Sequence, residues 1–419
     1  MIKADTLPSL WEKIFAIAGL FCFSGAVQRF FLIDTVDAID VSAGNPAFQI
    51  LWFSIYGITL ILLVLRTRAL PTILGFNPLI LAFILYLTAS VSWSQEPDVT
   101  LRRTAGIWGP SLFAFYLMCR FDLPMLLKLT SLALGFAAIG SLFYGLALPD
   151  QGIMHDESPE LQGAWRGLYT HKNSLGQVML GNAIINLALW RLNKNILILL
   201  GLSLAVVLII LSRSTTSLIL LPLGFIFPFL QQFIHKSVKI QYVVFVLVFI
   251  LMITIVLIGA SAENFVVELT GKDFTFTGRV GLWDMVITSI MQKPLIGYGY
   301  GAFWLGEMGE SGKINAALEL IYDTAHNGYL DLALDLGIIG LLLFLFIMLT
   351  YLVIFFNNFF IHRKEEYLWG FTFLFLQLIY NFFEGNLVKQ NNLYWILFLF
   401  AITSYHINFV KVSQPYQPV

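Results

Sequence analysis

Residues 338–356 read IIGLLLFLFIMLTYLVIFF and carry no charged side chain. A helix of about 20 apolar residues is long enough to cross the hydrocarbon core of a bilayer. This stretch belongs to a longer apolar segment, residues 327–357, which has enough length to tilt in a membrane or to project beyond it. We therefore expect a membrane-spanning helix here, and the rest of the chain is interpreted outward from it.

The composition of the whole chain indicates that the bilayer is its main solvent. Of 419 residues, 58% are hydrophobic and only 12% are charged, with a mean hydropathy of +0.81. A soluble domain usually carries about 25% charged residues, which this chain lacks for a water-facing surface. The net charge of −1 argues against a nucleic-acid partner. The composition predicts an all-α polytopic membrane protein.

The same criterion finds further apolar segments on both sides of residues 327–357, twelve in all. They are residues 12–32, 47–66, 74–92, 104–120, 124–146, 174–191, 195–212, 215–234, 239–260, 327–357, 367–384 and 391–411. The first segment resembles a signal peptide, because lysines precede an apolar run, but the spans that follow favour an uncleaved helix. We expect residues 1–419 to form one membrane domain of about twelve transmembrane helices.

The charges between these segments predict the orientation of the chain. Cytoplasmic loops of membrane proteins are enriched in Lys and Arg. With both termini in the cytoplasm, the inner ends hold 13 of the 24 basic residues but only five of the 25 acidic ones. The long acidic loops, residues 147–172 and 261–326, then face the periplasm. Loops of this length are usually functional.

The larger loop has internal patterning. Residues 279–291 have helical periodicity, and Thr277 can cap the start of this helix. Its expected apolar face consists of Val280, Trp283, Val286, Ile287 and Ile290. The following segment, residues 294–301 (PLIGYGYG), predicts a turn whose backbone can approach a ligand or the membrane surface.

Basic residues gather in four separate segments on the predicted outer side. They are Arg102, Arg103, Arg166, Lys172, Arg213 and Arg279. Arginine makes bidentate contacts to phosphate and stays charged. A helix that begins near residues 212–216 would add amide groups that favour an anion. We expect a site for a lipid-linked diphosphate; the alternative is that these arginines bind phospholipid headgroups or pair with the outer acids.

Two histidines stand where outer loops enter the predicted membrane. His326 precedes Asn327, and His171 precedes Lys172 and Asn173. Histidine can act as a general base near neutral pH. The alternative for either residue is a histidine at a helix end that bonds to a carbonyl. His155 and its acidic neighbours are too sparse a set to predict a metal site, and we expect no metal.

Tryptophans accompany these polar residues. Trp93, Trp165, Trp283 and Trp304 fall on the predicted outer side. Their faces can stack on a sugar ring, which makes Trp93, Trp165 and Trp283 candidates for sugar contacts. The alternative is the ordinary aromatic belt at a membrane interface.

In this order the motifs resemble those of the O-antigen ligase and polysaccharide polymerase superfamily of bacterial inner membranes. The resemblance covers about residues 90–340, and its motifs are Trp93-Ser94, Arg166-Gly167, His171-Lys172-Asn173, Ser212 to Thr216, Gly278-Arg279, the PLIGYG run from Pro294, and His326-Asn327-x-x-Leu330-x6-Gly337. The stretch Thr170 to Gly176 is more similar to the exopolysaccharide polymerase branch than to the lipopolysaccharide ligase branch.

The resemblance implies a metal-independent, inverting glycosyltransferase of the GT-C-like membrane type. Its donor would be a glycan on undecaprenyl diphosphate, its acceptor a sugar hydroxyl of a glycolipid, and its active site would face the periplasm. His326 and Arg279 would be catalytic. Residues that would bind diphosphate or substrate are Arg166, Arg213, His171, Lys172, Asn173, Arg102, Arg103 and Asn327. The resemblance implies no cofactor.

Two alternatives remain open at this point. An O-antigen ligase would transfer a finished glycan to lipid A-core, whereas a polymerase would join repeat units. A transporter would also suit twelve spans, but transporters place charged or broken helices near the middle of the bilayer. The predicted span centres lack charges, apart from Lys128 and the pair Asp331 and Asp335 near helix ends. The sequence leaves open whether a partner protein regulates chain length.

Overall fold

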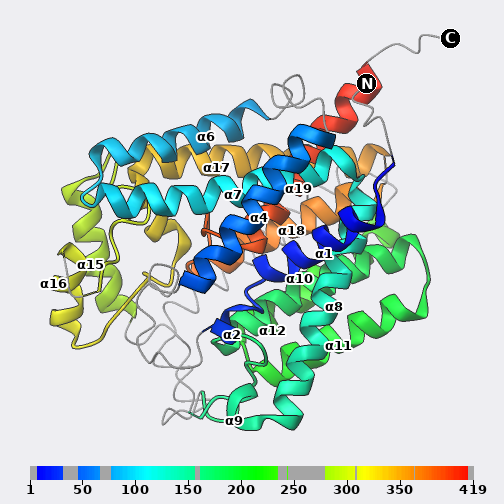
Figure 1. Ribbon diagram of the computed structural model, residues 1–419, viewed down its shortest axis with the longest axis horizontal. Coiled ribbons are helices and arrows are strands. Elements are labelled where there is room, and N and C mark those ends of the chain that lie inside the picture. The colour runs from blue at the N-terminus through cyan, green and yellow to red at the C-terminus, as the bar shows by residue number, and fades with distance from the viewer. Residues whose placement is uncertain are drawn as a thin grey trace.

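The computed structural model describes residues 7–31, 46–66, 77–155, 161–234, 243, 279–306, 309–362 and 364–413. These residues form helices joined by turns, and their strand pairing is limited to one isolated bridge between Ile153 and Trp165 (Figure 1). The helices are α1 Leu10–Phe23, α2 Gln28–Phe31, α4 Pro46–Arg66, α6 Pro78–Ala89, α7 Pro97–Arg120, α8 Leu123–Ala147, α9 Pro149–Gly152, α10 Lys172–Leu192, α11 Ile196–Ser212, α12 Thr215–Ile234, α15 Arg279–Gln292, α16 Gly309–Leu318, α17 Gly328–His362, α18 Glu365–Phe383 and α19 Leu393–Ser413. The all-α class is confirmed for these residues.

Three of the described helices are long and apolar enough to cross a membrane by length and composition: Ala47–Arg66, Leu123–Ala147 and Gly328–Phe359. The other predicted spans, where the structure describes them, fall mainly on helix, whereas residues 239–260 lie outside the described ranges apart from residue 243. The number of twelve spans and the two periplasmic loops therefore stay predictions.

Two predicted boundaries differ from the structure. The first segment is broken after Phe23, because the chain turns at Gly25, which has a left-handed φ of 87°. Arg102 and Arg103 were expected in a loop before a span, but they lie within α7, which begins at Pro97. Proline is favoured in the first turn of a helix, where its missing N–H is not needed.

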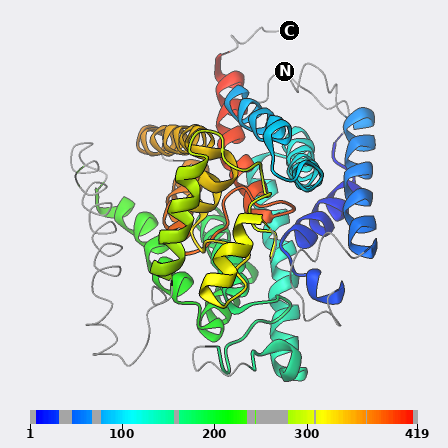
Figure 2. The same cartoon turned by 90° about the vertical axis from the view of Figure 1, so that its left-hand side faces the viewer.

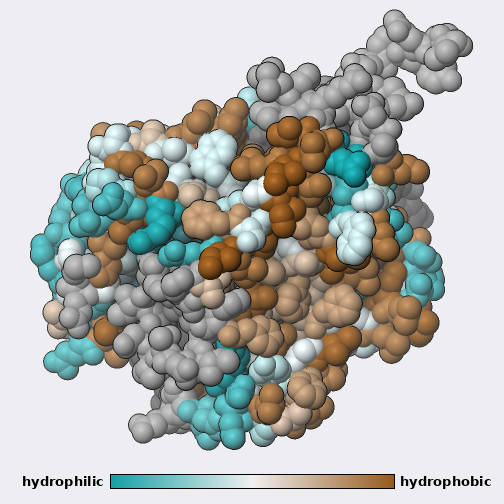
Figure 3. Space-filling view, viewed as in Figure 1, coloured by the Kyte–Doolittle hydropathy of each residue, from teal (hydrophilic) through white to brown (hydrophobic). Residues whose placement is uncertain are grey.

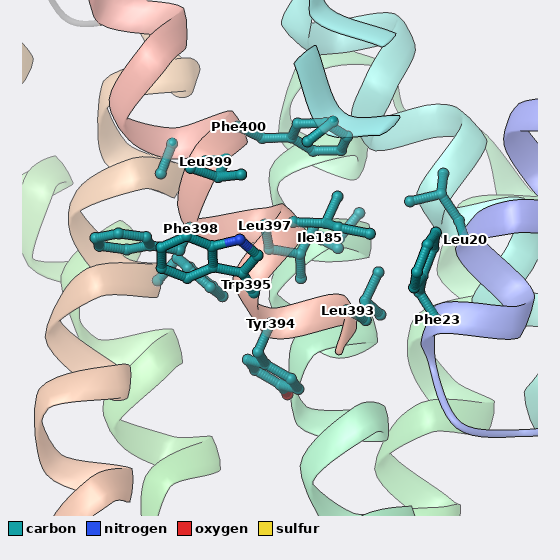
Figure 4. Packing of buried hydrophobic residues seen from close by; sticks show 14 of the residues in the cluster. Leu20, Phe23, Ile185, Leu393, Tyr394, Trp395, Leu397, Phe398, Leu399 and Phe400 are labelled. Atoms are coloured by element: carbon teal, nitrogen blue, oxygen red, sulfur yellow. The ribbon is translucent and has the colours of Figure 1, made fainter. Parts of the chain in front are cut away.

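The helices pack around a shared apolar core. Trp395 and Phe398 of α19, Ile185 of α10, and Leu20 and Phe23 of α1 all belong to one buried cluster (Figure 4). The outer surface is also largely apolar: brown residues cover much of the face in Figure 3, while teal residues gather over the α15–α16 end and near α9. An apolar surface around an apolar core is typical of a protein that faces lipid.

One end of the bundle is fixed by two ion pairs. Arg120 Nε lies 2.6 Å from Glu12 Oε1, and both side chains are buried. Arg191 Nε lies 2.8 Å from Glu365 Oε2. All four residues belong to helix ends that the alternating topology predicts on the cytoplasmic side, so the structure brings these ends together.

The opposite end is covered by α15, α16 and the turns beside them (Figures 1 and 2). This part has its own small core, formed by Leu282, Val286, Tyr298, Phe303, Ile314, Ala325 and Leu334. The predicted apolar face of α15 is partly wrong. Leu282 is fully buried, whereas Ile287 is 48% exposed, so the buried face is rotated toward Leu282.

The glycine-rich turn at residues 294–301 contacts protein backbone. α17 has a non-helical Gly337, with φ 66° and ψ −173°, and a Cβ there would lie 2.2 Å from Leu295 O. The turn replaces hydrogen bonds at this break, since Tyr298 N donates to Leu334 O at 2.8 Å and Ile338 N donates to Pro294 O at 2.8 Å. The turn therefore packs on the kink of α17, which the sequence did not predict, and its approach to a ligand or to the membrane surface stays a prediction.

Candidate functional site

His326 lies in a tight turn directly before α17. Its backbone has a left-handed φ of 51°, which is uncommon for a residue other than glycine. The His326 N–H donates to Thr324 Oγ1 at 3.2 Å. Asn327 begins α17, because its side-chain oxygen accepts the N–H groups of Tyr329 at 3.0 Å and Leu330 at 3.3 Å. Asn327 is therefore a helix cap, and its side-chain oxygen is used within the protein.

Asp331 holds this turn from the first turn of α17. Its carboxylate accepts three hydrogen bonds: from Thr324 Oγ1 at 2.5 Å, from Ala325 N at 2.8 Å and from Trp304 Nε1 at 2.9 Å. Trp283 Nε1 donates to Ala325 O at 2.9 Å on the other side of the turn. The position of His326 is thus set by contacts to the two residues before it.

Glu384, at the end of α18, joins two of the predicted site residues. Its Oε1 accepts a hydrogen bond from Asn173 Nδ2 at 2.7 Å. Its Oε2 lies 3.9 Å from His326 Nδ1, and that nitrogen is buried without a hydrogen-bond partner. His326 is therefore not a helix-end histidine bonded to a carbonyl through Nδ1. The carboxylate of Glu384 links the start of α10 to the turn before α17.

Arg279 reaches the same place from α15. Its Nη1 donates to Phe383 O at 2.6 Å, and Phe383 precedes Glu384. Three elements that are far apart in the sequence thus converge on residues 383–384 through Arg279, His326 and Asn173. We call these three residues together with Glu384 the His326 cluster.

Sequence reasoning missed the loop that carries Glu384. Gly385 packs so closely that an added Cβ would lie 2.2 Å from Asp331 Oδ2. The Asn386 amide bonds to Gln177 of α10, and its N–H donates to Asn381 Oδ1 at 3.1 Å. The available signal was a single acid at the outer end of a predicted span, followed by glycine and several amides. Only the fold shows which histidine it faces.

His171 caps α10. Its Nδ1 accepts the N–H of Asn173 at 3.2 Å, which leaves the hydrogen of a neutral ring on Nε2. A histidine in that state donates through Nε2, so the structure favours the helix-cap alternative over a general base. Lys172 lies half-buried in the first turn of α10.

Arg166 and Arg213 are tied to the loop that precedes α10. Arg166 donates to Gln151 O at 2.9 Å, and burial lowers the pKa of its guanidinium. Arg213 ends α11 in a left-handed conformation and donates to Gln162 O at 3.0 Å. The segment after Arg213 packs on α10 near Asn173, since a Cβ on Gly176 would lie 2.5 Å from Ser214 Cβ. The guanidinium of Arg213 itself lies beside Gln162 and Gly163, in the loop that precedes α10.

Arg29 is a further basic residue near this loop, and the sequence did not single it out. It donates to Tyr169 O at 3.4 Å and lies close enough to Arg166 for their charges to repel. Arg29 lies in α2, the short helix after the break in the first predicted span. Because that span was predicted to be one continuous apolar helix, Arg29 was not identified as a loop residue.

Arg102 and Arg103 take different surroundings. Arg102 is exposed on α7. Arg103 donates a hydrogen bond to Gly301 O, in the turn that packs on the kink of α17. Its positive charge also attracts the carboxylate of Asp335. Arg103 is thus part of the support of that turn, and the described contacts of the two arginines do not include a member of the His326 cluster.

The candidate tryptophans are anchored within the protein. Trp93 Nε1 donates to Ile296 O at 2.9 Å, and Trp165 packs against Gly145 of α8. Trp283 borders the turn of His326 through its bond to Ala325. All three side chains are partly exposed, so their rings keep surface that another molecule can contact.

These features define an all-α membrane protein with a polar cluster of Arg, His, Glu and Asn at one end of its bundle. Residues 198–345 match the profile of the O-antigen ligase family, a range that holds Arg213, Arg279 and His326. The resemblance to the O-antigen ligase and polysaccharide polymerase superfamily is confirmed by this match.

Individual relatives agree over shorter stretches. The exopolysaccharide production protein ExoQ of Rhizobium meliloti (strain 1021) is 28% identical over 99 residues, which cover 23% of this chain and 23% of that protein. A candidate polysaccharide ligase of Rickettsia conorii (strain ATCC VR-613 / Malish 7) is 36% identical over 77 residues, 18% of this chain and 19% of that protein. A similar one of Rickettsia prowazekii (strain Madrid E) is 34% identical over 77 residues, with the same coverage. The matched stretches thus span less than a quarter of these relatives.

Proposed function

We propose that this chain is an inner-membrane glycosyltransferase that polymerises exopolysaccharide repeat units on the periplasmic face. The donor is a glycan linked to undecaprenyl diphosphate, and the acceptor is a sugar hydroxyl on a second lipid-linked glycan. Twelve spans with both termini in the cytoplasm would place the α15–α16 end, with its polar surface, in the periplasm.

The observation that carries this proposal is the His326 cluster. His326 lies directly before a helix of membrane-spanning length, close to a carboxylate and an arginine from two other elements. Such a group of side chains suits the removal of a proton from a hydroxyl next to an anion. The family profile covers the histidine and Arg279, which supports their roles in such a transfer.

The proposed reaction divides the work among these residues. His326 removes the proton of the acceptor hydroxyl as its oxygen attacks the anomeric carbon from the face opposite the diphosphate, which inverts the configuration. Arg279, together with Arg213 and Arg166 of the loop before α10, would neutralise the charge that develops on the departing diphosphate, a role that bidentate guanidinium groups fill well. In this proposal the guanidinium groups do what a metal ion does in other transferases. Trp283, whose Nε1 bonds to Ala325 O, would stack on a sugar face beside the base.

An O-antigen ligase is the second candidate. The Rickettsia relatives are named for polysaccharide ligation, whereas the Rhizobium relative is named for exopolysaccharide production. The segment Thr170 to Gly176 favours the polymerase, and it forms the start of α10 beside Glu384. A partner that regulates chain length would fit either activity.

Measurement of glycan length in a deletion strain separates the candidates. Loss of a polymerase leaves single repeat units on the lipid carrier, whereas loss of a ligase leaves long chains that are not attached to lipid A-core. Loss of a transporter would leave neither product. Complementation by the wild-type gene is the control, and a deletion strain with normal polymer would refute the proposed polymerase.

A further inference from the structure

The two ring nitrogens of His326 have different surroundings. Nδ1 is buried and has no hydrogen-bond partner, although the side chain as a whole is 34% exposed. The ring therefore meets an incoming molecule through its other edge, which carries Nε2. A buried ring nitrogen without a partner is costly unless a group nearby can bond to it.

Glu384 is the carboxylate that faces this nitrogen, and its position is well supported. Asn173 holds Oε1 at 2.7 Å, which leaves Oε2 toward His326 at 3.9 Å. The backbone N–H of Glu384 donates to Tyr380 O at 3.0 Å, so the residue is fixed to the last turn of α18. Its side chain is only 17% exposed. The separation exceeds a hydrogen bond by about 1 Å, and catalytic hydrogen bonds are often long before substrate binds.

We propose that Glu384 is a positioning residue that accepts the Nδ1–H of His326, an inference that rests on the proposed function. The bond selects the tautomer whose Nε2 is free to take a proton, and it stabilises the imidazolium that forms. A carboxylate serves a histidine base in this way in serine hydrolases. Asn173 is then a second positioning residue, because it orients the carboxylate.

The proposed transfer balances in protons and electrons with the donor and acceptor as its only reactants. The acceptor O–H gives its proton to His326 Nε2, and the oxygen lone pair forms the new glycosidic bond. The bond between the anomeric carbon and the diphosphate oxygen breaks, and its electron pair stays on that oxygen. The proton on the imidazolium passes afterwards to water or to the departing diphosphate, which regenerates the base. The Nδ1–H stays on the ring and bonded to Glu384 throughout.

The substitution Glu384→Gln tests this role because it conserves shape. Gln can still accept the bond from Asn173, but its amide donates toward Nδ1 and selects the opposite tautomer, with the hydrogen on Nε2. We expect turnover of the purified, reconstituted full-length protein to fall by about 10²–10⁴-fold, while the KM for the lipid-linked donor stays nearly unchanged. A purely structural role would instead lower the thermal stability.

Glu365→Gln is the matched control at the other end of the same helix. Glu365 accepts hydrogen bonds from Arg191 Nε and Nη2 at 2.8 and 2.9 Å at the first turn of α18, and the proposed reaction gives it no role. The Glu365→Gln variant should have a lower melting temperature than the wild type and an unchanged turnover. Glu384→Gln should show the reverse pattern.

A second readout does not depend on activity. Nitrogen-15 NMR of histidine-labelled protein in nanodiscs, with His326→Ala to identify the signal, reports which ring nitrogen carries hydrogen. We expect hydrogen on Nδ1 in the wild type and on Nε2 in Glu384→Gln. The same tautomer in both, or normal turnover in Glu384→Gln, would overturn the inference. If the wild type transfers no glycan, the proposed function fails, and the tautomer still decides the role of Glu384.

Discussion

His326 owes its chemistry to contacts made by its neighbours. Thr324 and Ala325 are held by the Asp331 carboxylate, and Trp283 holds the carbonyl of Ala325. The imidazole itself makes no such contact through Nδ1. A ring whose backbone is fixed and whose Nδ1 lies 3.9 Å from a carboxylate needs only a small movement to form that bond when substrate binds.

Removal of the imidazole should lower rate and leave the fold intact. Turnover of His326→Ala should fall by about 10²–10⁴-fold, the usual range for a lost general base. Donor binding should stay close to that of the wild type, because in the proposed reaction the arginines bind the diphosphate. Thermal stability and glycan transfer of the reconstituted protein are to be measured together. A stable variant with near-normal turnover would remove His326 from the mechanism.

Arg279 should be required for its geometry as well as its charge. Its Nη1 donates to Phe383 O at 2.6 Å, and a guanidinium carries five N–H donors in a planar fork that matches the shape of an anion. Arg279→Ala should abolish most transfer in a folded protein, and Arg279→Lys should not restore it fully, since lysine lacks the fork. Arg66→Ala, at the predicted cytoplasmic end of α4, is the control and should be active. Wild-type polymer from Arg279→Ala would refute the anion role.

At the scale of elements, the break in α17 determines where its first turn points. Gly337 adopts a conformation that only glycine takes readily, and the turn of residues 294–301 supplies the hydrogen bonds that the break removes. The same short segment of α17 carries Asp331, which holds the His326 turn. The kink and the candidate site are therefore one structural unit.

Gly337→Ala should consequently destabilise the protein by about 1–3 kcal/mol or more, the cost of a strained backbone conformation, with a clash against Leu295 O in addition. The expected result is a lower melting temperature and less folded protein in detergent. Gly135→Ala in α8 is the matched control, because a Cβ there meets nothing within 4 Å and helical alanine is favourable. Equal melting temperatures for the two variants would contradict this account of the kink.

At the scale of the whole molecule, charged side chains gather in two separate groups along the bundle. Two ion pairs, Glu12–Arg120 and Arg191–Glu365, fix one end. The His326 cluster and the α15–α16 unit lie among the helix ends predicted on the opposite side. An enzyme that joins lipid-linked sugars needs such an arrangement, since its substrates lie with their lipid in the bilayer and their glycan in water.

This arrangement predicts which residues react with a membrane-impermeant thiol reagent. Lys313→Cys on α16 should label from outside intact cells, and Lys194→Cys after α10 should label only once the inner membrane is permeabilised. Both lysines are exposed, so neither result depends on burial. The background should lack Cys22 and Cys119, which are partly buried. The opposite labelling pattern would reverse the orientation.

The sequence by itself determined the class of the protein and its principal side chains. Apolar runs of membrane length leave a chain few choices other than helices, because backbone polar groups in lipid must bond within their own segment. His326, Arg279 and Asn173 were also identifiable, since charged and polar groups beside the membrane carry a cost that suggests a function.

Only the tertiary structure decided which of these groups meet. Glu384 lies 58 residues after His326 and 211 after Asn173, so no local pattern pairs them, and their proximity depends on how α10, α17 and α18 pack. The glycine-rich turn likewise packs on the break at Gly337, a pairing that no local pattern of residues 294–301 predicts. Hydropathy along the sequence indicates whether a segment faces lipid or water. Contacts between segments depend on how the helices pack, and the candidate site consists of such contacts.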